Sequence, residues 1–391
     1  MAQATNGRRA PVPFRRLLTN ARPTGAPPDG APPPTPSAGN TRRRGVLAAR
    51  ILVPALALTL LAVVVLSSSV GTIDVSPAEA LRIIVGHLVP GMPWMSDGSL
   101  TTVQDNAVWQ FRLPRALLAA TAGAALALAG ALMQAVVHNS LAEPYILGVS
   151  AGAGVGAVSF IVLGVGTSAL GVGGAAFLGA LAATAAVYTL AHKNGRIAPQ
   201  RLILAGVALG SLFSAVTSYL TITTHAQNVF SIMFFLLGSV SAATMNHLAL
   251  PSAALLIVGL YAAFHARALN ALLVGDDAAA SLGVNVNRLR SGALVAAALL
   301  TGSVVAVSGG IGFVGLIIPH IARIIVGSDH RRMLPVALLG GAVFLATCDF
   351  LARTLADPSE IPLGVLTAMV GAPFFLWLLR RDRADSVGVG R

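Results

Sequence analysis

Charged residues are scarce in this sequence. Only 10% of its 391 residues are charged and 55% are hydrophobic, whereas a soluble domain carries about 25% charged residues. A chain with so few charged groups cannot cover itself with a surface that water solvates well, which excludes an ordinary soluble protein. The lipid bilayer is the better solvent, because apolar runs of about 20 residues match a hydrocarbon core ~30 Å thick.

Cysteine and lysine are nearly missing, with Cys348 and Lys193 the single residue of each type. One cysteine excludes an intramolecular disulfide, and the apolar run around Cys348 indicates a small core residue. The net charge of +12 is carried almost entirely by arginine. A basic chain can indicate nucleic-acid binding, but no basic segment interleaved with aromatic residues is present. We expect membrane lipid as a partner and no nucleic acid.

Signatures of ATP binding and of ion coupling are also missing. The sequence contains no G-x-x-x-x-G-K-[ST] phosphate loop, so we predict a chain that is not an enzyme and holds no cofactor. His320 has no second His, Cys or carboxylate at ligand spacing, and no metal site is predicted. Paired intramembrane carboxylates are absent as well. An ion-coupled secondary transporter is the alternative of another class, and this absence counts against it.

The apolar runs that dominate the chain predict an all-α fold, a polytopic bundle of membrane helices. They lack the period-2 alternation of barrel strands, and helices satisfy the backbone amides that lipid cannot. Ten membrane-spanning helices are predicted, at about residues 46–70, 114–137, 145–166, 170–191, 201–223, 247–266, 290–308, 311–327, 333–354 and 363–380. Five precede the segment 224–246 and five follow it, so we expect two five-helix halves of inverted topology.

Composition divides the chain into three parts. Residues 1–44 are predicted to be a disordered cytoplasmic tail rich in Pro, Ala and Arg, residues 45–383 the transmembrane domain, and residues 384–391 a short cytoplasmic tail. Three arginines before the first apolar run would also fit a twin-arginine signal peptide, but that run is long and many spans follow. The basic residues of the loops predict a multi-pass protein of the cell membrane with both termini in the cytoplasm.

Four arginines depart from this charge bias, because they lie on the predicted outer side: Arg82, Arg112, Arg115 and Arg353. Arg112 and Arg115 are three residues apart and share a helix face. Asp349 precedes Arg353 by four residues and can pair with it along the helix. Snorkelling to the membrane interface is one explanation. Recognition of carboxylates on a partner protein is the other, since arginine binds carboxylates by charge-assisted pairing.

Short helices are predicted in three connections between the spans. The segments 77–84 and 224–246 would lie on the outer face, and a loop with Met92, Trp94 and Met95 would anchor at the interface, with a ligand contact by the methionines as the alternative. On the cytoplasmic side, residues 275–283 predict a helix that begins at aspartates and ends at Gly283. This helix is too short to span. It offers either a surface that another protein can bind or an ordinary loop.

Several blocks of the sequence together resemble the iron-siderophore and cobalamin importer permeases of the FecCD type. The resemblance covers about residues 46–381, and its blocks are residues 111–115, 130–134, 138–144, 147–153, 204–209, 275–283, 312–320, 360–364 and 371–375. Asn139-Ser140 stands where the family usually has Asn-Pro.

The resemblance implies a ten-helix permease subunit of an ABC importer that carries a ferric siderophore, with cobalamin or haem as alternative cargoes. Its implied partners are a second permease subunit, identical or different, two cytoplasmic ABC ATPase subunits, and an extracytoplasmic substrate-binding protein or lipoprotein.

The resemblance also implies roles for particular residues. Arg112, Arg115 and Arg353 match arginines that dock the binding protein. The ATPase-coupling helix matches Gly275, Asp276, Asp277, Ala279, Ser281, Leu282 and Gly283. The inner gate of the family matches Pro199 and Gln200. The vitamin B12 permease has small hydroxyl residues at these two positions.

Overall fold

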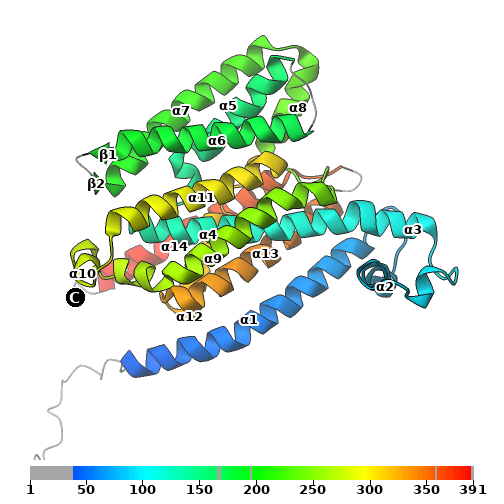
Figure 1. Ribbon diagram of the computed structural model, residues 1–391, viewed down its shortest axis with the longest axis horizontal. Helices are drawn as coiled ribbons and strands as arrows, with labels where there is room; N and C mark the ends of the chain where they lie inside the picture. Colours follow the sequence, from blue (N-terminus) through cyan, green and yellow to red (C-terminus); the bar gives the residue numbers. More distant parts are fainter. Residues whose placement is uncertain (1–37, 165–168, 194–195, 357–358, 389–391) are drawn as a thin grey trace, which may run out of the picture. The chain divides into compact units, whose positions relative to one another are not determined.

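The computed structural model describes residues 38–164, 169–193, 196–356 and 359–388 (Figure 1). Within these ranges the regular secondary structure is helical, with turns and loops between the helices, except for two short antiparallel strands, β1 (His192–Lys193) and β2 (Arg196–Ile197). The predicted all-α class is confirmed. The ten predicted spans correspond, in the described part of the chain, to α1 (Ala38–Ser69), α4 (Leu113–Val137), α5 (Val149–Val162), α6 (Ala169–Ala191), α7 (Pro199–Thr223), α9 (Ala249–Leu272), α11 (Val286–Ser308), α12 (Val314–Val326), α13 (His330–Thr354) and α14 (Leu363–Gly388).

Seven helical segments among the described residues are long and apolar enough to cross a membrane, whereas α5, α12 and the apolar part of α14 are shorter. Irregular backbone explains two of the short helices. The 3₁₀ turn η3 (Pro144–Leu147) and the left-handed Gly148 lead into α5, and the left-handed Phe313 leads into α12. Two predicted spans therefore consist of an irregular segment followed by a half-length helix.

Shorter elements lie in the connections. The helices predicted at 77–84, within 224–246 and at 275–283 are present as α2 (Pro77–Leu88), α8 (Ala226–Leu237) and α10 (Asp276–Ser281). The side of the membrane on which each lies stays a prediction. The remaining short elements are η1 (Pro93–Met95), α3 (Thr102–Asn106), the π-helical η2 (Ala107–Arg112) and η4 (Met245–Leu248).

Three helix ends differ from the predictions. α1 begins at Ala38, so residues 38–44 of the predicted tail are helical. Arginine is a good helix former and prolongs the helix that the apolar run stabilises. The rest of that predicted tail, residues 1–37, lies outside the described residues. The second span begins at Thr102, because α3, η2 and α4 form one continuous helix. α14 continues to Gly388, past the predicted domain end at residue 383.

Helix α4 forms the core of the bundle. It packs against α9, α11, α12 and α13 (Figure 1), and nearly all its side chains are buried. Small residues allow the close approach that drives helix association in lipid. A Cβ atom at Gly130 would lie 1.8 Å from the carbonyl oxygen of Gly315 in α12, and one at Gly123 would lie 2.1 Å from that of Gly341 in α13.

Packing in the two halves of the bundle follows one pattern. Helices α4, α5, α6 and α7 of the first half match α11, α12, α13 and α14 of the second half. Replacing each helix by its match turns one packed pair into another packed pair. The contact α4–α13 becomes α11–α6, α5–α6 becomes α12–α13, α4–α12 becomes α11–α5, and α5–α7 becomes α12–α14. Matching helices lie five positions apart in the order of the spans, an odd offset that gives them opposite directions if successive spans alternate. This packing is the pattern that the expected inverted halves would produce.

Pro319 lies within α12, and the helix continues through it. Proline has no N–H group, so the carbonyl of Gly315, four residues earlier, loses its intrahelical donor. The side chain of Gln134 in α4 supplies a donor there, because its Nε2 atom lies 3.4 Å from the oxygen of Gly315 and 3.1 Å from that of Leu316. A side chain of the core helix thus repairs the hydrogen-bond gap in α12.

Candidate functional site

Polar side chains gather at the two ends of α4. The first group, the arginine end, comprises Arg112, Arg115, Arg353, Asp349 and Glu360. The second group, the α10 end, comprises α10 with His138 and Arg290. α4 has 25 residues, so at ~1.5 Å per residue the two ends lie about 37 Å apart. This separation exceeds a hydrocarbon core ~30 Å thick, and the two groups can face opposite sides of a membrane.

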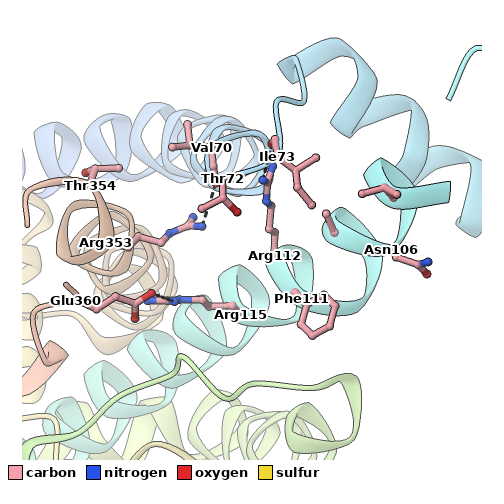
Figure 2. Close-up of a pocket in the computed structure, with 13 residues that line it drawn as sticks. Val70, Thr72, Ile73, Asn106, Phe111, Arg112, Arg115, Arg353, Thr354 and Glu360 are labelled. Atoms are coloured by element: carbon pink, nitrogen blue, oxygen red, sulfur yellow. Dashed lines mark hydrogen bonds and ion pairs between the residues drawn. The ribbon is translucent and has the colours of Figure 1, made fainter. Parts of the chain in front are cut away.

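An open cavity of about 820 Å³ lies at the arginine end (Figure 2). Its walls come from residues 70–73 after α1, from α3 and η2, from the start of α4 and from the end of α13. Figure 2 shows Arg112, Arg115 and Arg353 around this cavity, with Glu360 against Arg115. The structure therefore brings together the three arginines that the sequence analysis singled out.

Arg112 is buried, and its guanidinium caps the end of α1. Its Nη1 atom donates to the carbonyl of Ser69 at 2.7 Å and its Nη2 atom to that of Ile73 at 2.6 Å. The last carbonyls of a helix have no intrahelical donor, and a cation is favourable there. Gly71 provides the space, because a Cβ atom at this position would lie 2.6 Å from Nη2 of Arg112.

Arg115 binds two carboxylates that are distant in the sequence. Its Nε and Nη2 atoms each lie 2.9 Å from Oδ1 of Asp349, and its Nη1 atom lies 2.8 Å from Oε1 of Glu360. Asp349 is fully buried, whereas the side chain of Glu360 is 41% exposed. The fork of the guanidinium matches a carboxylate in this geometry, so Arg115 joins α4 to α13 and to the segment before α14.

Arg353 interacts mainly with the backbone at the end of α1. Its Nη2 atom donates to the carbonyl of Ser67 at 2.5 Å and to the Ser67 hydroxyl, and its Nη1 atom donates to the carbonyl of Val70 at 3.3 Å. The predicted pair with Asp349 is present at 3.9 Å. Asp349 lies closer to Arg115 than to Arg353, a preference that sequence spacing did not reveal.

All three arginines therefore have partners within their own chain. The side chains of Arg115 and Arg353 are each only 11% exposed. A carboxylate from a docking protein would have to compete with these partners, and Glu360 is the most exposed acid among them. Binding-protein docking at these arginines stays a prediction.

At the α10 end, the predicted coupling segment forms a short helix between two glycines. Gly275 (φ +115°) precedes α10 and Gly283 (φ +81°) follows it, conformations that glycine adopts without strain. Ala279 is fully buried and anchors the helix, whereas Leu282 is 72% exposed. Asp277 and Ser281 are also exposed. The helix presents a mixed apolar and polar surface, and its role in ATPase coupling stays a prediction.

Pro199 and Gln200, the predicted gate residues, are the first two residues of α7. They follow the β1–β2 hairpin and belong to the same side as α10, because Tyr188 near the end of α6 shares a hydrogen bond of 3.0 Å with Ser291 near the start of α11. Gln200 is exposed. A gating role for this pair stays a prediction.

A groove of about 820 Å³ runs between α5 and α7. Its lining includes four glycines, and its hydroxyl groups come from Tyr145, Ser150, Ser211, Ser214, Thr217 and Ser218. The residues that line it carry no formal charge. This groove therefore presents hydrogen-bonding groups, and no charged group that would bind an ion, along the largely exposed helix α7.

Three residues of the site were not predicted from the sequence. Arg290 and His138 join α10 to the bundle, through Asp276 and through each other. Glu143 accepts a hydrogen bond of 2.6 Å from the backbone N–H of Phe313 and so caps the start of α12. His138 and Glu143 both belong to the block 138–144 that carries the family resemblance. Their roles could not be predicted from it, because their partners lie far away in the chain.

Comparisons with known proteins agree with this arrangement. The model of the FecCD transport family matches residues 59–381. The cobalamin import system permease protein BtuC of Halobacterium salinarum is 38% identical over 82% of this chain and 93% of its own length. The hemin transport system permease protein HmuU of Yersinia pestis is 41% identical over 73% of this chain and 88% of its own length.

A solved structure also shares the fold. It is described as an inward-facing conformation of a candidate metal-chelate type ABC transporter, and it aligns with a TM-score of 0.73 and 34% identity, over 85% of this chain and 99% of its own. The resemblance first seen in the blocks of the sequence thus extends over the bundle, and the chain belongs to the FecCD transport family.

Proposed function

We propose that this chain is the permease subunit of an ABC importer that moves a ferric siderophore into the cytoplasm. The family match over residues 59–381 carries the importer assignment. The cargo is supported by the names of similar proteins, which refer to cobalamin, hemin and a metal chelate. In each of these a metal ion is held in an organic ligand, and a ferric siderophore is of the same class. Cobalamin and haem are the alternative cargoes.

The working assembly contains two permease subunits, two ATPase subunits and a substrate-binding protein. Separate ATPases are needed because this sequence has no phosphate loop. Arg267, Arg288, Arg331 and Arg332 lie near the ends of α9, α11 and α13 at the α10 end, which favours the cytoplasmic side for that end. The arginine end then faces outward, and both termini lie in the cytoplasm.

Each end of the bundle has a partner in this assembly. Arg112, Arg115 and Arg353 position the binding protein at the arginine end, where the cavity is open. Residues 275–283 contact the ATPase at the α10 end, since Leu282 is exposed there. Pro199 and Gln200 lie at the inner mouth of the pathway. ATP binding closes the ATPases, α10 moves, and the pathway opens to the other side.

The groove between α5 and α7 is the proposed wall of this pathway. It has hydroxyl groups and no charged side chain in its lining, so it can pass a large polar complex without holding it. Transport requires that binding along a path be weak enough for release. A second permease subunit would supply the opposite wall.

Uptake by the reconstituted importer tests this proposal. The permease, its ATPase and its binding protein are placed in proteoliposomes, and uptake of ⁵⁵Fe-siderophore, labelled cobalamin and hemin is compared in the presence of ATP. ATP-dependent uptake of the siderophore alone supports the full proposal. Preferential uptake of cobalamin or hemin overturns the cargo and keeps the importer.

The ion-coupled alternative is decided in the same vesicles. An ABC importer needs ATP and continues when an ionophore collapses the ion gradients. A secondary transporter shows the reverse dependence, which would contradict the proposed function.

A further inference from the structure

We infer that Arg290 and His138 are positioning residues that fix α10 to the end of the buried helix α4, so that a displacement of α10 is passed to α4. The consequence for transport rests on the proposed function, whereas the attachment itself is a property of this chain alone.

Arg290 provides the direct hold on α10. Its Nη1 atom lies 2.8 Å from Oδ2 of Asp276, and its Nη2 atom donates to Oδ1 at 2.9 Å. Two parallel bonds of this kind fix orientation as well as distance. The side chain of Arg290 is 5% exposed, whereas that of Asp276, the first residue of α10, is 45% exposed. The fixed partner therefore belongs to the bundle and the accessible partner to α10.

His138 extends this contact to α4 and α9. It follows the last residue of α4 in a left-handed conformation, with φ 53°. Its Nδ1 atom lies 3.3 Å from Nη2 of Arg290, and its Nε2 atom lies 2.7 Å from the carbonyl of Leu272 at the end of α9. One neutral tautomer satisfies both contacts, since Nε2–H donates to Leu272 while Nδ1 accepts from Arg290. The side chain of His138 therefore joins the end of α4 to α9 and to Arg290, in addition to the turn that its backbone forms.

Four helices meet at these two side chains. Arg290 belongs to α11 and holds α10, while His138 caps α4 and binds the end of α9. At its other end α4 carries Arg115, which binds Asp349 and Glu360. A continuous series of bonded contacts thus leads from the exposed α10 through the core helix to the arginine end. A rigid helix between two attached ends is a physical route for coupling, and coupling has to be measured rather than assumed.

Two variants separate positioning from folding. Arg290→Gln removes the charged fork, and it leaves no buried acid without a partner because Asp276 is partly exposed. His138→Asn removes both imidazole contacts and keeps a residue type that tolerates the left-handed region. Arg288→Gln is the matched control, because Arg288 is exposed, lies on the same helix and carries the same charge.

The first measurement is hydrogen exchange of the α10 amides in the purified full-length permease. We expect exchange of the Ala279 amide, and of the Val284 amide that bonds to the Ala279 carbonyl just after α10, to rise about tenfold or more in Arg290→Gln and His138→Asn, the factor that corresponds to a loss of ~1.4 kcal/mol. The α13 amides and the Arg288→Gln control should keep the wild-type rates. Wild-type exchange at α10 in both variants would overturn the attachment.

The second measurement is ATP hydrolysis by the assembled complex with its ATPase subunits and binding protein. Stimulation of hydrolysis by the binding protein should fall about tenfold in Arg290→Gln, while the ATPase still co-purifies with the permease. Wild-type stimulation together with loosened α10 would overturn transmission to α4. If the ATPase does not bind the wild-type chain at all, the proposed function fails, and the exchange data still decide the attachment.

Discussion

The two ends of α4 hold the same kind of ion pair in different surroundings. At the arginine end Asp349 is fully buried and Arg115 is 11% exposed, whereas at the α10 end Asp276 is 45% exposed and Arg290 is 5% exposed. A buried carboxylate cannot exchange its partner for water without a large cost. A half-exposed carboxylate can. The acid of the arginine end is therefore sealed within the bundle, whereas the acid of the α10 end stays in contact with solvent while the buried Arg290 holds it.

Disrupting the packing of α4 against its neighbours should have the largest effect on the stability of the protein. In Gly130→Leu the new side chain would begin 1.8 Å from the carbonyl oxygen of Gly315, a backbone atom that cannot rotate away. We expect loss of the folded protein, measured as lost monodisperse material after detergent extraction. Gly259→Leu is the control, since a Cβ atom there meets nothing within 4 Å. A well-behaved Gly130→Leu protein would contradict the close crossing of α4 and α12.

Removing the acid from each ion pair should sharpen the contrast between the two ends. Asp349→Ala leaves Arg115 buried with Glu360 as its remaining acid, and breaking a buried pair costs about 3–5 kcal/mol. Asp276→Ala removes a half-exposed acid from the buried Arg290, so we expect a smaller loss of about 1.5–3 kcal/mol, the range for a hydrogen bond to a charged group. Thermal unfolding of the two variants in the same detergent measures the difference. Equal shifts in Tm would show that burial does not distinguish the ends.

Docking at the arginine end should respond to the acid that already occupies Arg115. Glu360→Ala frees Nη1 of Arg115, so we expect binding of the substrate-binding protein to tighten by a few-fold, an effect of about 1 kcal/mol for an exposed charge pair. Arg115→Ala should weaken binding. Both effects should shrink as salt rises, because exposed charges are screened. Binding titrations at two salt concentrations give the result, with Asp97→Asn as a control at a separate exposed site.

The weakest effect is expected at α2, beyond the arginine end. Ser76 and Glu79 form a capping box at its start, with hydrogen bonds of 2.7 and 3.2 Å. The bond from the Ser76 backbone holds the pKa of Glu79 below its usual value of 4.5. A lowered pKa stabilises the helix above pH 4.5 and loses that contribution as the pH falls through the lowered value. Hydrogen exchange at α2 should accelerate on acidification there, and Glu79→Gln should remove that pH dependence.

Hydropathy predicted the helices well, because a long apolar run indicates directly that the segment lies in lipid. It did not predict where α5 and α12 would begin, since the left-handed backbone conformations of Gly148 and Phe313 do not change the hydropathy of the sequence. The site was predicted only in part. Charge bias pointed to Arg112, Arg115 and Arg353, but their partners depend on packing: Asp349 lies 234 residues from Arg115. The same limit hid Arg290 and His138, which are 152 residues apart.

Burial of the single cysteine has a practical consequence for every experiment above. Cys348 is 4% exposed within α13, so a thiol reagent in solution has little access to it. A new cysteine on the exposed surface of α10, or beside Glu360, would then be the thiol that reacts. The unaltered chain is therefore a ready background for spectroscopic labels, and the movement of the two ends of α4 can be followed without first replacing a core residue.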